Sequence, residues 1–145
     1  MTAQAPEAGV FPGVRSLRVP ARVDDALRAL LVLAAAPPSA RVKLTEVSEI
    51  EGISPRFLST VLVALRDHGL VRSHRGAMGG YWLARPADEI TVADVYDAVD
   101  LREPLPVPGS EVTGDLWHQV QTELRARLEA LTVAGLLAGR ACSGS

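Results

Sequence analysis

The first apolar pattern in the chain has a helical period. Between Pro20 and Pro37 the apolar residues fall at positions i, i+3, i+4, i+7, i+8 and i+11, which places them on one side of a helix. Pro20 suits a first helical residue because the N–H it lacks has no partner there, and Pro37-Pro38 ends the helix. The pattern predicts a helix of about four turns with one buried stripe. The stripe consists of Val23, Ala26, Leu27, Leu30, Leu31 and Ala34.

Two shorter helices are predicted next, separated by about three residues. The first is expected to begin near Thr45 as its N-cap and to end at Gly52, which suits a left-handed residue after a helix. The second begins at Ser54-Pro55, a capping hydroxyl followed by a proline, and ends at residues 68–69. A helix-turn-helix and an αα-hairpin in an all-α core both fit this pair. The inward stripe of the second helix consists of Phe57, Leu58, Val61, Leu62 and Leu65.

A hairpin pattern follows the third helix. Residues 70–74 and 81–84 have strand-like composition and are joined by the hexapeptide RGAMGG. Three glycines in this loop raise the entropy cost of ordering it, so their presence requires a structural or functional explanation. One explanation is a wing whose backbone approaches a phosphate and whose Arg75 is free to enter a minor groove. The other is a plain hairpin turn. The preceding helix pair favours the wing.

The last third of the chain contains a loop and a long helix. Residues 101–114, LREPLPVPGSEVTG, hold three prolines and two glycines and are predicted to be a loop. A helix is then expected from Asp115 to about Leu137, with one apolar stripe. We expect this stripe to form a two-fold dimer contact; packing against the first helix of the same chain is the alternative, and both can hold. The stripe consists of Leu116, Val120, Leu124, Leu128 and Leu131.

Together these elements predict a fold that is mostly α with a small β-wing, a winged helix-turn-helix followed by a long C-terminal dimerisation helix. Residues 1–16 are rich in Ala, Gly and Pro without periodicity and are expected to be a disordered N-terminal extension. The winged helix-turn-helix domain is assigned to residues 17–86, and a connecting helix and proline-rich loop to 87–114. The dimerisation helix is assigned to 115–138 and a flexible tail to 139–145.

Charge is distributed unevenly along the chain, although the net charge is only −2. Residues 41–85 carry seven Lys and Arg against four Asp and Glu, a net charge of +3, whereas residues 86–145 carry four arginines against ten acids, a net charge of −6. Phosphate binding would explain a basic module beside an acidic one. No apolar run approaches the roughly 18 residues of a membrane span, and the N-terminus has no signal-peptide pattern. We therefore expect a cytoplasmic protein without a membrane partner.

Residues for metal binding or catalysis are scarce. The one cysteine, Cys142, excludes an internal disulfide framework and a cysteine-rich metal site. His68, His74 and His118 have no ligand-like spacing, so we expect no metal. No Ser/His/Asp or paired-carboxylate arrangement has supporting context, and the glycine-rich hexapeptide lacks the G-x-x-x-x-G-K-[ST] pattern. The sequence therefore predicts a protein that is not an enzyme and uses no cofactor.

From about residue 17 to 137 the chain resembles the Rrf2 family of bacterial transcription regulators. Three motifs carry the resemblance: GIS, spaced leucines and GLV at 52–71, RG…GGY.LARP at 75–86, and IT..DV..AVD at 90–100. The resemblance implies a homodimeric repressor or activator with its third helix in the major groove and its wing in the minor groove. We expect DNA binding by Ser54, Pro55, Arg56, Phe57, Ser59, Thr60, Arg75, Gly76, Gly79 and Gly80, with Lys43 and Thr45 on the same surface.

The chemistry of these residues suits DNA, and two departures from the family's pattern matter. Arg56 can donate two hydrogen bonds to guanine O6 and N7, and Ser59 and Thr60 can bond to bases or phosphates. Ala77-Met78 replaces the usual Pro-Gly of the wing. The loop at 101–114 carries none of the three cysteines that hold an iron–sulfur centre in cluster-binding members, so we expect no protein-ligated cluster.

The sequence thus predicts a homodimeric DNA-binding regulator, with repression as the expected mode, that reads a pseudo-palindromic operator with residues 54–68 and 70–84. The expected partners are double-stranded DNA, a second copy of the chain and a small-molecule or protein effector. Trp82, Tyr96 and Trp117 are candidates for an effector pocket, with aromatic core filling as the alternative. A winged-helix protein-interaction module that no longer binds DNA is the alternative function, suggested by the net acidic charge and the altered wing.

Overall fold

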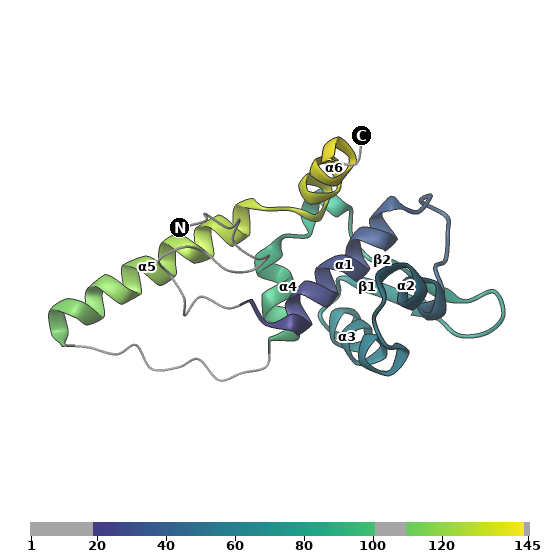
Figure 1. The fold of residues 1–145 in the computed structure, drawn as a ribbon, viewed down its shortest axis with the longest axis horizontal. Helices are drawn as coiled ribbons and strands as arrows, with labels where there is room; N and C mark the ends of the chain where they lie inside the picture. Colours follow the sequence, from purple (N-terminus) through teal and green to yellow (C-terminus); the bar gives the residue numbers. More distant parts are fainter. Residues whose placement is uncertain (1–18, 101–109, 144–145) are drawn as a thin grey trace, which may run out of the picture.

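The computed structural model describes residues 19–100 and 110–143. Figure 1 shows a globular part built around α1 (Ala21–Ala35), from which α5 (Glu111–Ala130) extends as an arm. The N-terminal extension expected at 1–16 and most of the proline-rich loop fall outside the described residues. Residues 111–114, which we expected to belong to that loop, instead form the first turn of α5, because the Ser110 side chain caps the helix there. The predicted fold class, mostly α with a small β-wing, is confirmed.

Helix α1 supplies the centre of the hydrophobic core. It begins after Pro20 and buries Val23, Ala26 and Leu30 completely. Leu27 packs against the same core while remaining partly exposed. The helix predicted from the i, i+3, i+4 pattern is therefore confirmed, and most of the other helices pack against it.

Helices α2 (Leu44–Glu51) and α3 (Pro55–Asp67) form the predicted helix-turn-helix. Gly52 between them has φ +68°, the left-handed conformation that ends a helix without a Cβ clash. The Ser54 Oγ accepts a hydrogen bond from the Phe57 N–H at 3.3 Å and so caps α3. We predicted Thr45 as the N-cap of α2, and this was wrong. The cap lies two residues earlier, at Lys43, which makes no side-chain hydrogen bond there, and the helix begins at Leu44.

The wing is an antiparallel hairpin of β1 (Val71–His74) and β2 (Gly80–Leu83). Its register pairs Val71 with Leu83 at the base and His74 with Gly80 at the outer end. A third piece of chain joins the sheet, because the backbone of Val42 exchanges two hydrogen bonds with that of Tyr81, at 3.0 and 2.7 Å. This bridge fixes the wing against the segment that leads into α2.

The predicted C-terminal helix is two helices, α5 and α6 (Val133–Ser143). Helix α5 ends before Leu131 because the backbone there pairs with another segment. The Leu131 carbonyl accepts a hydrogen bond from the Val92 N–H, and the Val133 N–H donates to the Ile90 carbonyl, both at 2.9 Å. Helix α6 then turns back onto α1 and the short 3-10 helix η1 (Ala87–Glu89). Residues 139–143, expected as a flexible tail, belong to α6. None of the described helices is both long and apolar enough to cross a membrane.

A bidentate ion pair joins α5 to α4 (Val92–Val99). The Arg125 guanidinium donates to both carboxylate oxygens of Asp97 at 2.7 Å, and its Nε donates to Glu129 at 2.9 Å. The hydrogen bonds from Arg125 hold the pKa of Asp97 below its ordinary value. The contact fixes the C-terminal part of α5, which lies next to the globular part, relative to α4.

This ion pair makes a pH-dependent contribution to stability. The Asp97 carboxyl titrates near 3.8 when unfolded and lower when folded, so the contribution is present above that pH and is lost as the pH falls through the folded pKa. Because both side chains are more than two-fifths exposed, we expect at most about 1 kcal/mol. NMR titration should place the Asp97 midpoint below 3.8, and Arg125→Gln should return it towards that value. An unchanged midpoint in Arg125→Gln, or an equal shift in Arg127→Gln, would contradict this account.

Candidate nucleic-acid interface

Helix α3 divides cleanly into a buried and an exposed side. Leu58, Val61, Leu62 and Leu65 are fully buried, because they recur at helical spacing and face α1 and α4. The side chains expected to reach DNA lie on the other side or at its border. Pro55, Arg56 and Thr60 are exposed and Phe57 and Ser59 are half-buried.

Several of these residues also have structural roles. Phe57 packs against the core, so only part of its ring is available to a ligand. The Ser54 Oγ accepts from the backbone of α3, which leaves its O–H as a donor. The Thr60 O–H donates to the Arg56 carbonyl at 3.3 Å, which leaves its oxygen as an acceptor. Ser54 and Thr60 therefore offer complementary groups at the N-terminal half of α3.

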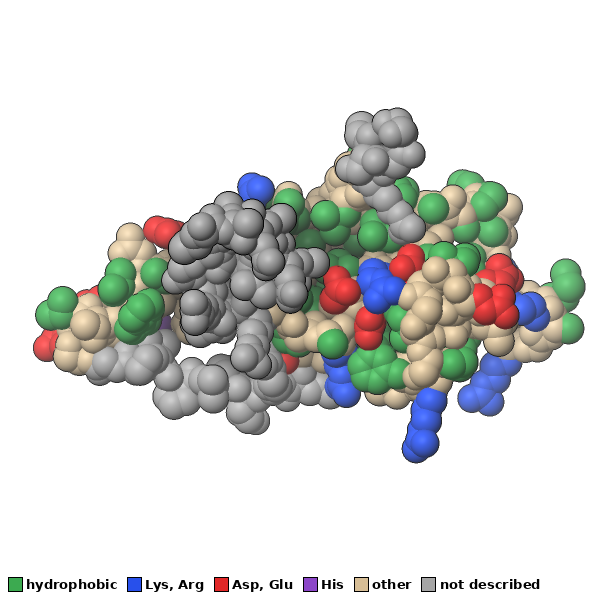
Figure 2. Space-filling model, in the orientation of Figure 1, with side chains coloured by type: hydrophobic (Ala, Val, Ile, Leu, Met, Phe, Trp, Pro, Cys, Tyr) green, Lys and Arg blue, Asp and Glu red, His purple; other side chains and the backbone are tan. Residues whose placement is uncertain are grey.

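Three exposed arginines of α3 and the wing have no acidic partner among the described residues, whereas Arg66 of α3 pairs with Asp67 at 3.7 Å. Arg28 pairs with Glu51 at 3.1 Å and Arg125 with Asp97 at 2.7 Å. Among the residues that the structure describes, no carboxylate lies within ion-pair distance of exposed Arg56 or Arg75, nor of exposed Arg72. In Figure 2, Lys and Arg side chains project from the edge of the molecule below α3 and the wing.

The glycines of the wing are required by the turn itself. The Gly79 N–H donates to the Gly76 carbonyl at 2.9 Å, and Gly76 has φ +111°. A Cβ on Gly79 would lie 2.0 Å from the carbonyl oxygen of His74, and one on Gly80 would lie 2.9 Å from that of Val42. Gly79 is buried within the turn, so it shapes the wing and offers little surface to a ligand.

Lys43 holds the wing loop in place. Its Nζ donates to the Ala77 carbonyl at 3.0 Å, across 34 positions in the chain. The contact leaves the Met78 side chain 86% exposed at the tip. Arg75 and Thr45 are also exposed. The structure therefore brings Lys43 to the wing, a contact that the sequence did not predict.

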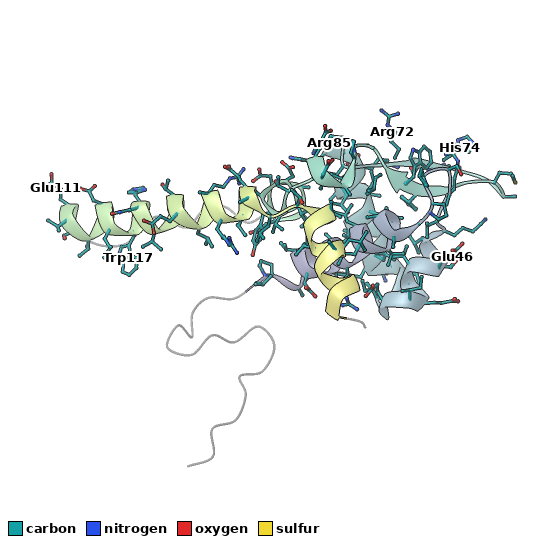
Figure 3. The ribbon with its side chains drawn as sticks, turned by 90° about the horizontal axis from the view of Figure 1, so that it is seen from above. Glu46, Arg72, His74, Arg85, Glu111 and Trp117 are labelled. Atoms are coloured by element: carbon teal, nitrogen blue, oxygen red, sulfur yellow. The ribbon has the colours of Figure 1, made fainter. Side chains whose placement is uncertain are left out.

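Two exposed polar side chains on the hairpin were not among the predicted site residues. Arg72 and His74 are both exposed because they lie two positions apart on one strand, and Figure 3 shows them at the same edge of the molecule. The alternating burial of β1 is a signal that the sequence pattern contains. Arg41 was also missed; its guanidinium lies 3.8 Å from the centroid of the Trp82 ring, a cation–π contact.

The predicted aromatic pocket does not form. Trp82 lines a cavity beside the base of the wing, whereas Tyr96 packs against the core. Trp117 is 43% exposed, and Figure 3 places it far along α5, away from the hairpin. The expectation that these three residues share one pocket was wrong, because α5 extends away from the globular part.

Comparisons with known proteins agree on one family. The sequence profile of the Rrf2 family, described as an iron-dependent transcriptional regulator, matches residues 19–139. A Mycobacterium tuberculosis H37Rv protein named as an HTH-type transcriptional regulator is 37% identical over 134 residues, covering 85% of this chain and 83% of that protein. A similarly named protein of Neisseria meningitidis serogroup B is 32% identical over 130 residues, covering 83% of this chain and 88% of that protein.

Solved structures give the same result. T. potens IscR matches with a TM-score of 0.75 and 32% sequence identity, covering 88% of this chain and 91% of that chain. Staphylococcus aureus CymR matches with a TM-score of 0.70 and 27% identity, covering 81% and 96%.

The residues of this chain do not fit an iron–sulfur cluster. Such clusters are held mainly by several thiolates, and the whole chain has one cysteine, Cys142. Among the described residues, no group of three or more His, Cys, Asp or Glu is placed to hold a metal ion. The similarity over nearly the whole chain and the winged helix-turn-helix together show that this chain belongs to the Rrf2 family of transcriptional regulators, as a member that lacks the cysteines for an iron–sulfur cluster.

Proposed function

We propose that this chain is a homodimeric DNA-binding repressor that reads a pseudo-palindromic operator with α3 and the wing, without a protein-ligated iron–sulfur cluster. One observation carries the proposal: Arg56, Arg72 and Arg75 are exposed on these two elements and have no carboxylate partner among the described residues. Unpaired arginines retain their full charge for phosphates and base edges.

The two elements suit different parts of a DNA duplex. Arg56 lies in the first turn of α3, where a helix in the major groove brings its N-terminal residues to the base edges. The α3 N-terminus adds a partial positive charge that favours a nearby phosphate. Arg75 lies at the start of the wing loop, beyond the end of β1, where it is placed to reach the backbone or the minor groove.

Helix α5 supports the dimer. None of its side chains is buried, although several are apolar. Leu116, Val120 and Leu124 are each nearly half exposed on one side of the arm. Leu128 and Leu131 are partly buried near the globular part, and Leu131 lies beyond the end of the helix. A soluble chain rarely leaves such a continuous apolar stripe in water. A second copy related by a two-fold axis would cover it and place two α3 helices about one or two helical turns of DNA apart.

Repression follows from occupancy. A dimer bound over a promoter blocks other proteins from the same DNA, and this mode needs no contact beyond DNA binding. Fluorescence anisotropy with genomic fragments recovered by crosslinking the protein to DNA would test the proposal. We expect binding much tighter than to a random duplex at moderate salt; equal affinities would contradict it.

Arg56 and Arg75 are expected to have different effects when replaced. Arg56→Ala should relax base preference by about 1–3 kcal/mol at one position per half-site. Arg75→Ala should weaken binding to all sequences and reduce the salt slope by about 1 per protomer. Anisotropy titrations with the operator and its single-base variants, over a range of salt concentrations, measure both quantities.

The matched control for this pair is Arg66→Ala. Arg66 lies in the last turn of α3 and already pairs with Asp67 at 3.7 Å, so its loss should change base preference little. If Arg56→Ala and Arg75→Ala acted equally on every sequence, the division between base reading and phosphate binding would be wrong.

A further inference from the structure

An open cavity of about 430 Å³ lies beside the base of the wing. Its walls come from the end of α1, the segment between α1 and α2, the end of β2 and η1. The volume falls within the range of about 300–1,000 Å³ typical of small-molecule sites. Most lining side chains are apolar, including Leu33, Pro37, Pro38 and Trp82, and Arg85 is the one charged residue lining it in the part of the chain that the structure describes.

Arg85 has a hydrogen-bond donor without an acceptor. Its Nη2 lies 3.5 Å from the Asp94 Oδ2, but that oxygen already accepts the Thr91 N–H at 3.0 Å as part of the α4 cap. The Arg85 Nε atom is buried and has no hydrogen-bond partner. That atom is enclosed by the protein, whereas the Arg85 side chain as a whole is 41% exposed, so a ligand in the cavity can approach only the exposed part of this side chain.

Trp82 supplies a flat apolar wall. Arg41 lies over its ring and lines a second, smaller hollow together with Pro38, but Arg41 does not line the larger cavity. Trp82 lines both hollows, so it remains accessible from the larger one. The rings of Pro37 and Pro38 line the same cavity, so a planar apolar group can lie against rigid surfaces there.

We propose that this cavity binds a small aromatic monocarboxylate, with its carboxylate paired with the exposed part of the Arg85 guanidinium and its ring against Trp82. A single negative charge fits because Asp94 already neutralises part of the Arg85 charge, and no other cation among the described residues lines the cavity. A second carboxylate would have no cationic partner among these lining residues, and an unpaired charge is disfavoured there.

The cavity is placed to affect the wing. Trp82 faces Arg72 across the hairpin, and Arg41 precedes Val42, whose backbone bonds to Tyr81. A ligand that moved the Trp82 ring would act on both attachments of the wing. Regulation by this ligand rests on the proposed DNA-binding function, because a ligand shifts DNA affinity only if it binds the two wing arrangements unequally.

The ligand assignment can be tested without DNA. In a Trp117→Phe protein Trp82 is the sole tryptophan, so its emission reports on the cavity. We expect benzoate to change this emission saturably with a Kd below about 1 mM, within the limit for a ligand of about nine heavy atoms. Benzamide, which has the same shape without the charge, should bind at least about tenfold more weakly.

Variants of Arg85 identify the carboxylate partner. Arg85→Gln should remove the preference for benzoate over benzamide, and Arg85→Lys, which keeps a charge beside Asp94, should weaken benzoate binding because an ammonium lacks the planar fork of a guanidinium. Arg66→Gln, on the outer side of α3, should preserve both affinities. No saturable change with benzoate, equal binding of benzamide, or full benzoate affinity in Arg85→Gln would overturn the assignment.

A second titration separates ligand binding from regulation. Saturating benzoate should change operator affinity at least about threefold, in a manner lost in Arg85→Gln. Benzoate binding with unaltered operator affinity would overturn the regulatory role. Absence of operator binding by the ligand-free protein would overturn the proposed DNA-binding function, while saturable benzoate binding would still support the ligand assignment.

Discussion

Replacing Gly79 by alanine is expected to disrupt the wing and to lower DNA affinity by at least about tenfold. The new Cβ would lie 2.0 Å from the His74 carbonyl oxygen and 2.9 Å from the Arg75 carbonyl carbon. These are backbone atoms, so the hairpin must open to accommodate them. Thermal or urea unfolding should show a loss of more than about 2 kcal/mol if the wing is coupled to the core. Anisotropy should show a salt slope reduced by about 2 per dimer, because each wing loses its Arg75 contact.

Gly114→Ala is the matched control for this substitution. Gly114 lies in the first turn of α5, and no atom lies within 4 Å of a Cβ built there. Alanine is the better helix former by about 0.5–1 kcal/mol, so Gly114→Ala should leave DNA binding unchanged and stabilise the chain slightly. Wild-type DNA affinity and stability in Gly79→Ala would mean that the wing has a different conformation from the one described.

Leu124→Glu is expected to convert the dimer into monomers. Leu124 is 44% exposed on the arm and belongs to the apolar stripe with Leu116 and Val120. In a two-fold contact the substitution places two carboxylates in an apolar interface, where an unpaired charge is strongly disfavoured. A monomer binds one half-site at a time, so the operator affinity should fall by about 10²–10⁴. Light scattering coupled to gel filtration measures the mass, and anisotropy measures the affinity.

Ala126→Glu tests whether the effect depends on the side of the helix. Ala126 is exposed and lies two residues after Leu124, so it faces the opposite side of α5. This variant should remain dimeric and bind the operator normally. A monomeric wild type, or a Leu124→Glu protein that stays dimeric, would contradict the role proposed for the arm.

Local signals in the sequence were sufficient to predict most of the globular part. The stripe around Leu30, the Ser54-Pro55 start of α3 and the glycine-rich hairpin each depend on residues close together in the chain. Such signals identify an element and one of its ends with little help from the rest of the fold. Thr45 shows the limit: it is a good capping residue, yet the helix begins before it.

Contacts between distant residues decided the rest. The apolar stripe continues through Leu131, so the sequence predicted one long helix. Backbone pairing with Ile90 and Val92 ends that helix and sends α6 back onto α1. No helical period encodes such a pairing, because it depends on where the segment at 90–92 lies after folding.

The candidate site was likewise predictable where local signals decide it and unpredictable where contacts between distant residues decide it. The exposure of Arg56 was predictable from its place outside the α3 stripe. The sequence predicted that the glycines of the wing have a specific role. Composition does not reveal that a Cβ at Gly79 would clash with the backbone of its own turn. The Lys43 contact with Ala77 and the unpaired Nε of Arg85 arise from side chains brought together by folding.

Selection of bound sequences from a library of random DNA duplexes tests the central claim most directly. The protein is incubated with the library at moderate salt, and the retained duplexes are sequenced after several rounds. We predict one enriched pseudo-palindrome whose half-sites are about one or two helical turns apart, with enrichment lost in Arg56→Ala at one position per half-site. A retained pool with no sequence preference would contradict the account and favour a winged-helix module that binds protein.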